Sequence, residues 1–171
     1  MLDHPITKAL MRVDPPLGPE DAIEAYIGVS DERYRGPRRH AFAVILHFSS
    51  GRDPIEITSP QSTSSGTHAQ RANLGAIITM LEWLVLNQAP ANHVTIYVID
   101  EWMANLKHAL RSKGSKMADL YRKIGPLLEA CPHVHFNWLK AVVPEGIHHE
   151  RHARAYSLAR ETVQQLLEPV S

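Results

Sequence analysis

Alternating apolar and polar positions dominate the first third of the chain. The runs Ile23–Ser30 and Ala41–Phe48 alternate and are rich in β-branched and aromatic residues, which predicts two strands joined by a turn at 31–37. A third strand is predicted at Ile55–Thr58. Residues 1–21 contain four prolines and little periodicity, and we interpret them as an irregular lead-in. The pattern therefore predicts three consecutive antiparallel strands.

Helical periodicity begins after a polar loop at 60–67. Apolar residues three and four positions apart predict a long helix at Ala69–Leu86, and the β-branched run His93–Ile99 predicts a strand buried on both faces. The remaining predicted elements are helices at about Glu101–Leu110 and Met117–Ala130, a strand at Val134–Leu139 and a last helix at His148–Leu167. The order β-β-β-α-β-α-α-β-α predicts one mixed α/β domain at 22–168.

The composition is that of an ordinary globular domain. Among 171 residues, 18 Lys and Arg balance 18 Asp and Glu, so bulk charge does not draw the protein to nucleic acid. Cys131 is the single cysteine and is interpreted as a small buried hydrophobe. The longest apolar stretch, Leu74–Leu86, is shorter than the about 20 residues that cross a bilayer. With no secretory pattern at the N-terminus, we expect a cytoplasmic protein without membrane contact.

Five short motifs follow one another in the order of these elements. They are QRANL at 70–74, IYVID at 96–100, MADLY at 117–121, FNWLK at 136–140 and AYSLAR at 155–160. Together they resemble the ribonuclease H family over about residues 22–165. The resemblance implies a five-stranded mixed sheet, three strands antiparallel and two parallel, flanked by helices. It also implies Mg²⁺-dependent cleavage of the RNA strand of an RNA–DNA hybrid by two metal ions.

The resemblance implies four carboxylates at fixed positions, and three of them are absent. Asp100 ends the fourth strand, whereas the first strand, the long helix and the last helix have Gly28, Asn73 and Tyr156. Two cations about 4 Å apart need dense negative charge, so we expect the reaction to be lost and no metal or cofactor to be bound. We expect a polar remnant in which the Tyr156 phenol fills the metal space. The alternatives are a weak one-metal site for Mg²⁺ or Mn²⁺ at Asp100 with Asn73, and a rearranged nuclease with substitute ligands.

A histidine-rich stretch, HHERH at 148–152, opens the last helix. The zinc-protease spacing H-E-x-x-H is not met, because His149-Glu150 is followed by His152 only three positions after His149. In the family, a histidine on the loop before the last helix assists product release, and the resemblance implies His148 or His149 as its counterpart. The alternative is an exposed, polar start of the helix.

Two basic clusters stand out against the zero net charge. The first contains Arg33, Arg35, Arg38, Arg39 and His40, and the second contains Lys107, His108, Arg111, Lys113 and Lys116. The resemblance implies that both regions contact the backbone phosphates of a hybrid, which would give salt-dependent binding without sequence readout. The alternative is a solvated surface.

These observations predict a catalytically degenerate ribonuclease H-like module. It would bind a nucleic acid, as a hybrid or a duplex, or a protein partner. The alternatives are an active or residual ribonuclease H that uses Asp100 with substitute ligands, and a structural oligomerisation module. The sequence does not determine the oligomeric state.

Overall fold

Five strands form a single sheet in the computed structural model, which describes residues 13, 15–32, 39–59, 69–87, 91–110, 118–139 and 146–167. Their order across the sheet is β3-β2-β1-β4-β5. The bounds are β1 Ile23–Glu32, β2 Arg39–Phe48, β3 Ile55–Thr58, β4 Val94–Val98 and β5 Val134–Trp138. β2 is antiparallel to β1 and β3, whereas β4 is parallel to β1 and β5. The predicted mixed sheet is confirmed.

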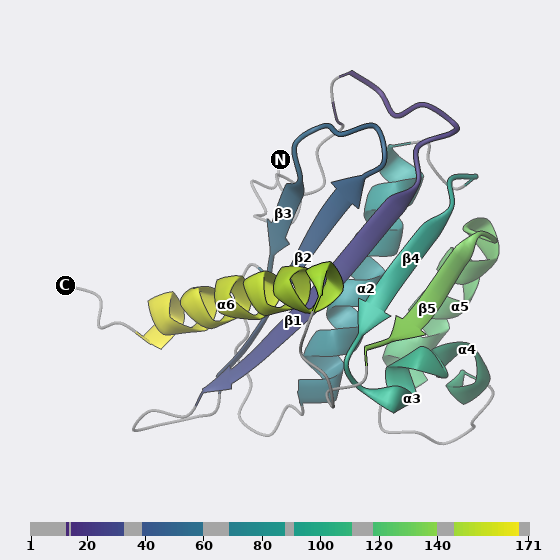
Figure 1. Cartoon of the computed structure of the whole chain (residues 1–171). Helices are drawn as coiled ribbons and strands as arrows, with labels where there is room; N and C mark the ends of the chain where they lie inside the picture. The colour runs from purple at the N-terminus through teal and green to yellow at the C-terminus, as the bar shows by residue number, and fades with distance from the viewer. Residues whose placement is uncertain are drawn as a thin grey trace, which may run out of the picture.

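Helices cover both faces of this sheet (Figure 1). The helices are α2 Ala69–Leu86, α3 Glu101–Ala104, α4 Leu106–Ala109, α5 Ala118–Ala130 and α6 Ile147–Leu167. α2 and α5 lie behind the sheet in this view, and α6 crosses its front over β1 and β2. Among the described residues, no helix combines the length and the apolar character required to cross a bilayer.

The period-two alternation of β1 divides the core into two parts. Ile23, Ala25 and Ile27 belong to the larger core with α2, where Trp83 and Cys131 are also buried. Burial raises the pKa of the Cys131 thiol, and the predicted role of this residue as a buried hydrophobe is confirmed. The alternate positions Glu24, Tyr26, Gly28 and Ser30 point to the face that α6 covers, because successive side chains of a strand point to opposite faces. The smaller core on that face contains Tyr26, Ile45, Tyr97, Leu139 and Ala155.

Two predicted boundaries differ from the structure. Asp31 and Glu32 are not turn residues but continue β1, where they pair with His40 and Arg39. The helix predicted at Glu101–Leu110 is two short helices that meet at Asn105. The Asn105 amide donates a 3.2 Å hydrogen bond to the Glu101 carbonyl, and such local side-chain bonds compete with helix continuation. The other elements end within one or two residues of their predicted bounds.

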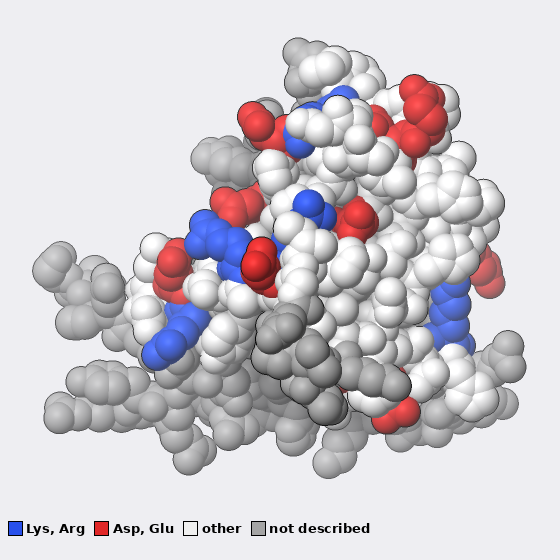
Figure 2. All heavy atoms as spheres, viewed as in Figure 1, with Lys and Arg blue, Asp and Glu red and all other residues white. Residues whose placement is uncertain are grey.

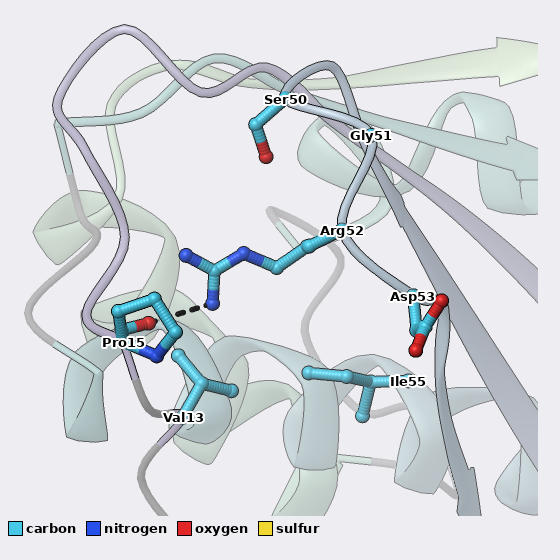
Figure 3. Close-up of a pocket in the computed structure, with 7 residues that line it drawn as sticks. All are labelled: Val13, Pro15, Ser50, Gly51, Arg52, Asp53 and Ile55. Carbon is cyan, nitrogen blue, oxygen red and sulfur yellow. Dashed lines mark hydrogen bonds between the residues drawn. The ribbon is translucent and has the colours of Figure 1, made fainter.

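The described part of the lead-in is attached to the body at several points. The backbone N–H of Val13 donates to Asn87 Oδ1 over 2.7 Å. Arg52, in the β2–β3 turn, donates to the carbonyls of Pro15 and Pro16 over 2.7 and 3.2 Å. Its guanidinium spans a hollow of about 550 Å³ between the turn and the lead-in (Figure 3). The side chain of Asn92 donates to the backbone carbonyls of Gly18 and Asp21.

Candidate functional site

Gly28 lies where α6 crosses β1. It pairs with Ala43 on β2, and both residues are buried. A Cβ atom built on Gly28 would lie 2.3 Å from the backbone N of Tyr156 and 2.4 Å from the carbonyl C of Ala155. These distances are far below van der Waals contact, so no side chain fits at this position while α6 keeps its place. The backbone of α6 rests directly on the backbone of β1.

Backbone atoms of α6, and not the Tyr156 ring, lie nearest to a Cβ built on Gly28. The atoms nearest to the missing side chain belong to the helix backbone, and the Tyr156 side chain remains 44% exposed. Ala155 and Ala159, which precede and follow it on α6, are completely buried. Small residues on both elements therefore bring the helix close to the sheet.

Asp100 follows the C-terminal end of β4 and precedes α3. Its backbone carbonyl accepts hydrogen bonds from the N–H groups of Met103 and Ala104 at 3.1 and 3.4 Å, and its side chain makes no capping bond. The carboxylate is partly exposed and interacts electrostatically with His152 of α6. The structure thus places one negative charge at the end of the parallel strands, as the sequence predicted.

His152 belongs to the histidine-rich stretch that the sequence pointed out, but the sequence did not predict its burial beside Asp100. Burial lowers the pKa of its imidazole, which His149 also lowers and which the Ile27 backbone and Asp100 raise. Its Nε2 atom is buried and has no hydrogen-bond partner within the described parts of the chain. The sequence places His152 one helical turn before Tyr156, which puts both residues on the same side of α6. The burial of His152 results from the close packing of α6 on the sheet, which the sequence does not show.

Asn73 lies in the second turn of α2, which packs behind the sheet, and its side chain is partly buried. It has interaction partners in the structure. The amide is neutral and offers an oxygen ligand without negative charge. The four positions that the resemblance assigns to carboxylates therefore have a glycine covered by the α6 backbone, an amide, a single carboxylate and an exposed phenol.

His148 lies in the first turn of α6 and belongs to an aromatic and charged cluster on β1 and β4. Its Nδ1 shares a 2.7 Å hydrogen bond with the Tyr26 hydroxyl, which donates to Glu24 Oε2 over 2.9 Å. Its ring stacks on Tyr97 at a centroid distance of 4.4 Å. Burial raises the pKa of Tyr26 and of Tyr97, so both phenols stay neutral. His148 is thus bonded to the sheet from the start of the helix, where the sequence predicted it, whereas the family's histidine implied by the resemblance lies on the preceding loop.

The basic clusters are only partly described. Arg33, Arg35, Arg38, Arg111, Lys113 and Lys116 lie outside the described residues, and so does the side chain of Arg39, whose backbone pairs with Glu32. His40 is completely buried, so its assignment to a surface cluster is wrong. The exposed Lys107 donates a 2.8 Å hydrogen bond from Nζ to the Val134 carbonyl.

The described face around α6 has mixed charge (Figure 2). Arg154 pairs with Glu56 at 3.3 Å and approaches Glu161 at 4.0 Å, and Arg151 lies 3.9 Å from Glu24. A broad area without Lys, Arg, Asp or Glu lies beside α6, over β4 and β5. Surface pairs of this kind screen one another, so this face presents no continuous positive stripe.

Comparisons with known proteins identify the architecture. No family model matches the chain, and no curated protein matches it. Among solved structures, LC11-RNase H1, isolated from compost by a metagenomic approach, matches with a TM-score of 0.60 and 18% identity over 88% of this chain and 100% of that one. The PFV RNase H domain matches with a TM-score of 0.64 and 14% identity over 85% and 96%. The chain has a ribonuclease H-like fold.

A third match shows a ribonuclease H-like protein with nucleic acid bound. It is LC11-RNase H1 in complex with an RNA/DNA hybrid, with a TM-score of 0.59 and 17% identity over 87% of this chain and 100% of that chain. These identities are all below one fifth, so the likeness concerns the fold.

The residues of this ribonuclease H-like chain do not fit a pair of Mg²⁺ ions. Such ions are held by several oxygen ligands that are mostly carboxylates, and the resemblance would place one of these at Gly28. The α6 backbone occupies that place. Within the described parts of the chain, no three His, Cys, Asp or Glu side chains are grouped so that they could share a metal ion. Among the four positions, Asp100 supplies one negative charge, whereas two divalent cations carry four positive charges.

Proposed function

We propose that this chain is a catalytically degenerate ribonuclease H-like module that binds a nucleic-acid duplex without cleaving it. The observation that supports the loss of catalysis is the contact of α6 with Gly28. A carboxylate side chain at position 28 would start from a Cβ atom. That atom would lie 2.3–2.5 Å from backbone atoms of Ala155 and Tyr156, which leaves no room for it. The absence of a side chain at Gly28 is therefore accompanied by close packing of α6 on β1, and a side chain at this position would need the helix to move.

The charge at the site supports the same conclusion. Asn73 offers a neutral amide and Tyr156 a phenol where the resemblance implies carboxylates, and Asp100 interacts electrostatically with His152 of α6. Loss of a single outer-shell partner typically lowers metal affinity or activity about 10–100-fold, and three direct carboxylate ligands are missing here. We expect no two-metal hydrolysis.

The fold and the predicted basic residues support binding. A protein with the same fold is known in complex with an RNA/DNA hybrid. Arg33, Arg35, Arg38 and Arg39 lie in or beside the β1–β2 connection, and Arg111, Lys113 and Lys116 follow α4. Cationic side chains on two connections can neutralise backbone phosphates without reading bases, which suits recognition of a duplex by shape.

A cleavage assay tests the loss of catalysis. Purified full-length chain is incubated with a labelled RNA–DNA hybrid in Mg²⁺ or Mn²⁺, beside the Asp100→Asn variant. We expect no cleavage above the background of either preparation, because one carboxylate does not hold two cations. Robust cleavage by the wild type that disappears in Asp100→Asn would overturn the proposal and favour the residual nuclease.

A binding assay tests the second half of the proposal. Fluorescence anisotropy with a hybrid, a DNA duplex and single strands is measured at two salt concentrations. We expect duplex binding that weakens with salt, and a double variant Arg35→Ala with Arg39→Ala that loses affinity and lowers the salt slope by about 0.9 for each lost phosphate contact. Lys123→Ala, exposed on α5 behind the sheet, is the matched control and should bind like the wild type.

Two results would contradict binding through these connections. One is the absence of duplex binding at low salt, which would favour a protein partner or an oligomerisation role that light scattering can examine. The other is an equal affinity of the wild type and the Arg35→Ala, Arg39→Ala variant.

A further inference from the structure

Two exposed histidines stand side by side at the start of the parallel strands β4 and β5. His93 precedes β4 and His133 precedes β5, and the next residues, Val94 and Val134, are direct partners in the sheet. The centroids of the two imidazole rings are 4.8 Å apart, and the ring planes are inclined by 45°. This pair lies at the opposite end of β4 from Asp100, so it is separate from the candidate site.

The sheet holds the backbones of both histidines in place. The His93 carbonyl accepts a 2.9 Å hydrogen bond from the N–H of Ile23, and the His133 carbonyl accepts a 3.0 Å hydrogen bond from the N–H of Val94. Val94 and Val134 are buried in the core. The two side chains therefore start from fixed positions, and a ligand that joins them would require little ordering of the backbone.

The spacing of the rings fits joint coordination of one metal ion. A zinc–imidazole bond of about 2.0–2.1 Å places each ring centre roughly 3 Å from the metal, so two rings on one ion stand at most about 6 Å apart. The observed 4.8 Å corresponds to two ligands at adjacent positions around the ion rather than on opposite sides of it. Only rotation about the side-chain torsions is needed to turn one nitrogen of each ring towards a common point.

We propose that His93 and His133 form a two-imidazole site for a transition-metal ion of the Cu²⁺, Ni²⁺ or Zn²⁺ class, with water completing the coordination. Imidazole suits these ions, whereas Mg²⁺ and Mn²⁺ prefer carboxylate, carbonyl and water ligands. Within the described residues no third His, Cys, Asp or Glu side chain completes a larger cluster. The bound ion would join β5, at the edge of the sheet, to β4 through side chains in addition to the backbone ladder.

Titration calorimetry of the untagged full-length chain with Ni²⁺ and with Zn²⁺ at pH 7.5 tests the site. We expect one ion per chain, and a loss of affinity of at least about tenfold in His93→Gln and in His133→Gln, since loss of an outer-shell partner alone costs that much. The double variant His93→Gln with His133→Gln should no longer bind one ion per chain. His135→Gln is the matched control, because His135 is an exposed histidine two residues further along the same chain segment.

A spectroscopic arm does not depend on the folding of the variants. The electron paramagnetic resonance spectrum of Cu²⁺ added to the wild type should show hyperfine coupling to two imidazole nitrogens. Binding should weaken in acid, because a protonated imidazole is not a ligand. The proposal is overturned by the absence of one-to-one binding, by unchanged affinity in His93→Gln and His133→Gln, by an equal loss in His135→Gln, or by a spectrum with a single nitrogen.

Discussion

Gly28 determines how closely α6 approaches the sheet. Its missing side chain allows backbone atoms of the helix to lie where a Cβ would stand, and buried alanines at 43, 155 and 159 extend this close contact. Gly75 on α2 is different, because a Cβ there would meet only Phe42 at 3.5 Å, which is an ordinary contact. A methyl group therefore fits at Gly75 but not at Gly28.

The variant Gly28→Ala should therefore be strongly destabilised. The new Cβ would collide with the backbone of Tyr156, and overpacking of this kind costs about 3 kcal/mol or more when the obstacle is backbone. Urea denaturation followed by circular dichroism measures the free energy of unfolding. Gly75→Ala, the matched control, should be neutral or more stable by about 0.5–1 kcal/mol because it replaces a helical glycine. Equal stability of Gly28→Ala and the wild type would show that α6 moves away easily.

At the scale of elements, α6 is the helix whose docking depends on titratable groups. Burial lowers the pKa of His47 on β2, which Arg151 also lowers and Glu24 raises, and burial lowers the pKa of His152. Both imidazoles lie between α6 and the sheet. The unfolded chain therefore takes up protons on these groups at a higher pH than the folded one does.

The consequence is a loss of stability in mild acid. A histidine whose folded pKa lies below the usual value of 6.5 contributes stability above that value, and this contribution is lost as the pH falls through 6.5 towards the lowered folded pKa. We expect the free energy of unfolding to be smaller at pH 5.5 than at pH 7.5. The double variant His47→Asn with His152→Asn should show a smaller difference between these pH values. An unchanged pH dependence in that variant would assign the effect to other groups.

The sequence predicted most elements, and the errors have physical causes. Period-two alternation identifies β1 and β2 because one face of each strand meets α2. The prediction of a single helix after β4 was wrong, because the helix is interrupted at Asn105, whose side-chain amide donates a hydrogen bond to the backbone of the same turn. At the site, Asp100 was predicted from the end of a strand, which is a local signal. The close approach of Gly28 and Ala155 joins segments more than 100 residues apart, and no local pattern reports it.

At the scale of the whole molecule, the described residues of the lead-in contact the rest of the chain at several points. Val13 and Leu17 pack against the larger core, and hydrogen bonds join this segment to Asn87, Arg52 and Asn92. The predicted division at residue 21 remains a prediction. The contacts nevertheless link the segment both to the end of α2 and to the β2–β3 turn.

We expect a chain that begins at residue 22 to be less stable than one that begins at Val13. Several hydrogen bonds of about 1 kcal/mol each and the partly buried Val13 and Leu17 are lost, so the difference should reach at least about 2 kcal/mol. Thermal and urea unfolding of both chains measure it. Arg52→Ala in the longer chain should reproduce part of the loss. Equal stability of the two chains would show that the lead-in is dispensable.

The seating of α6 on Gly28 also determines what an acidic side chain at position 28 would require. A single Gly28→Asp substitution would place the new side chain against the helix backbone. The helix would first have to be lifted, which would uncover Ala155 and break the bonds of His148 to the sheet. Each intermediate step would be less stable than the present chain. An acidic side chain at position 28 therefore requires several substitutions at once, because the helix and the strand must separate before the side chain fits.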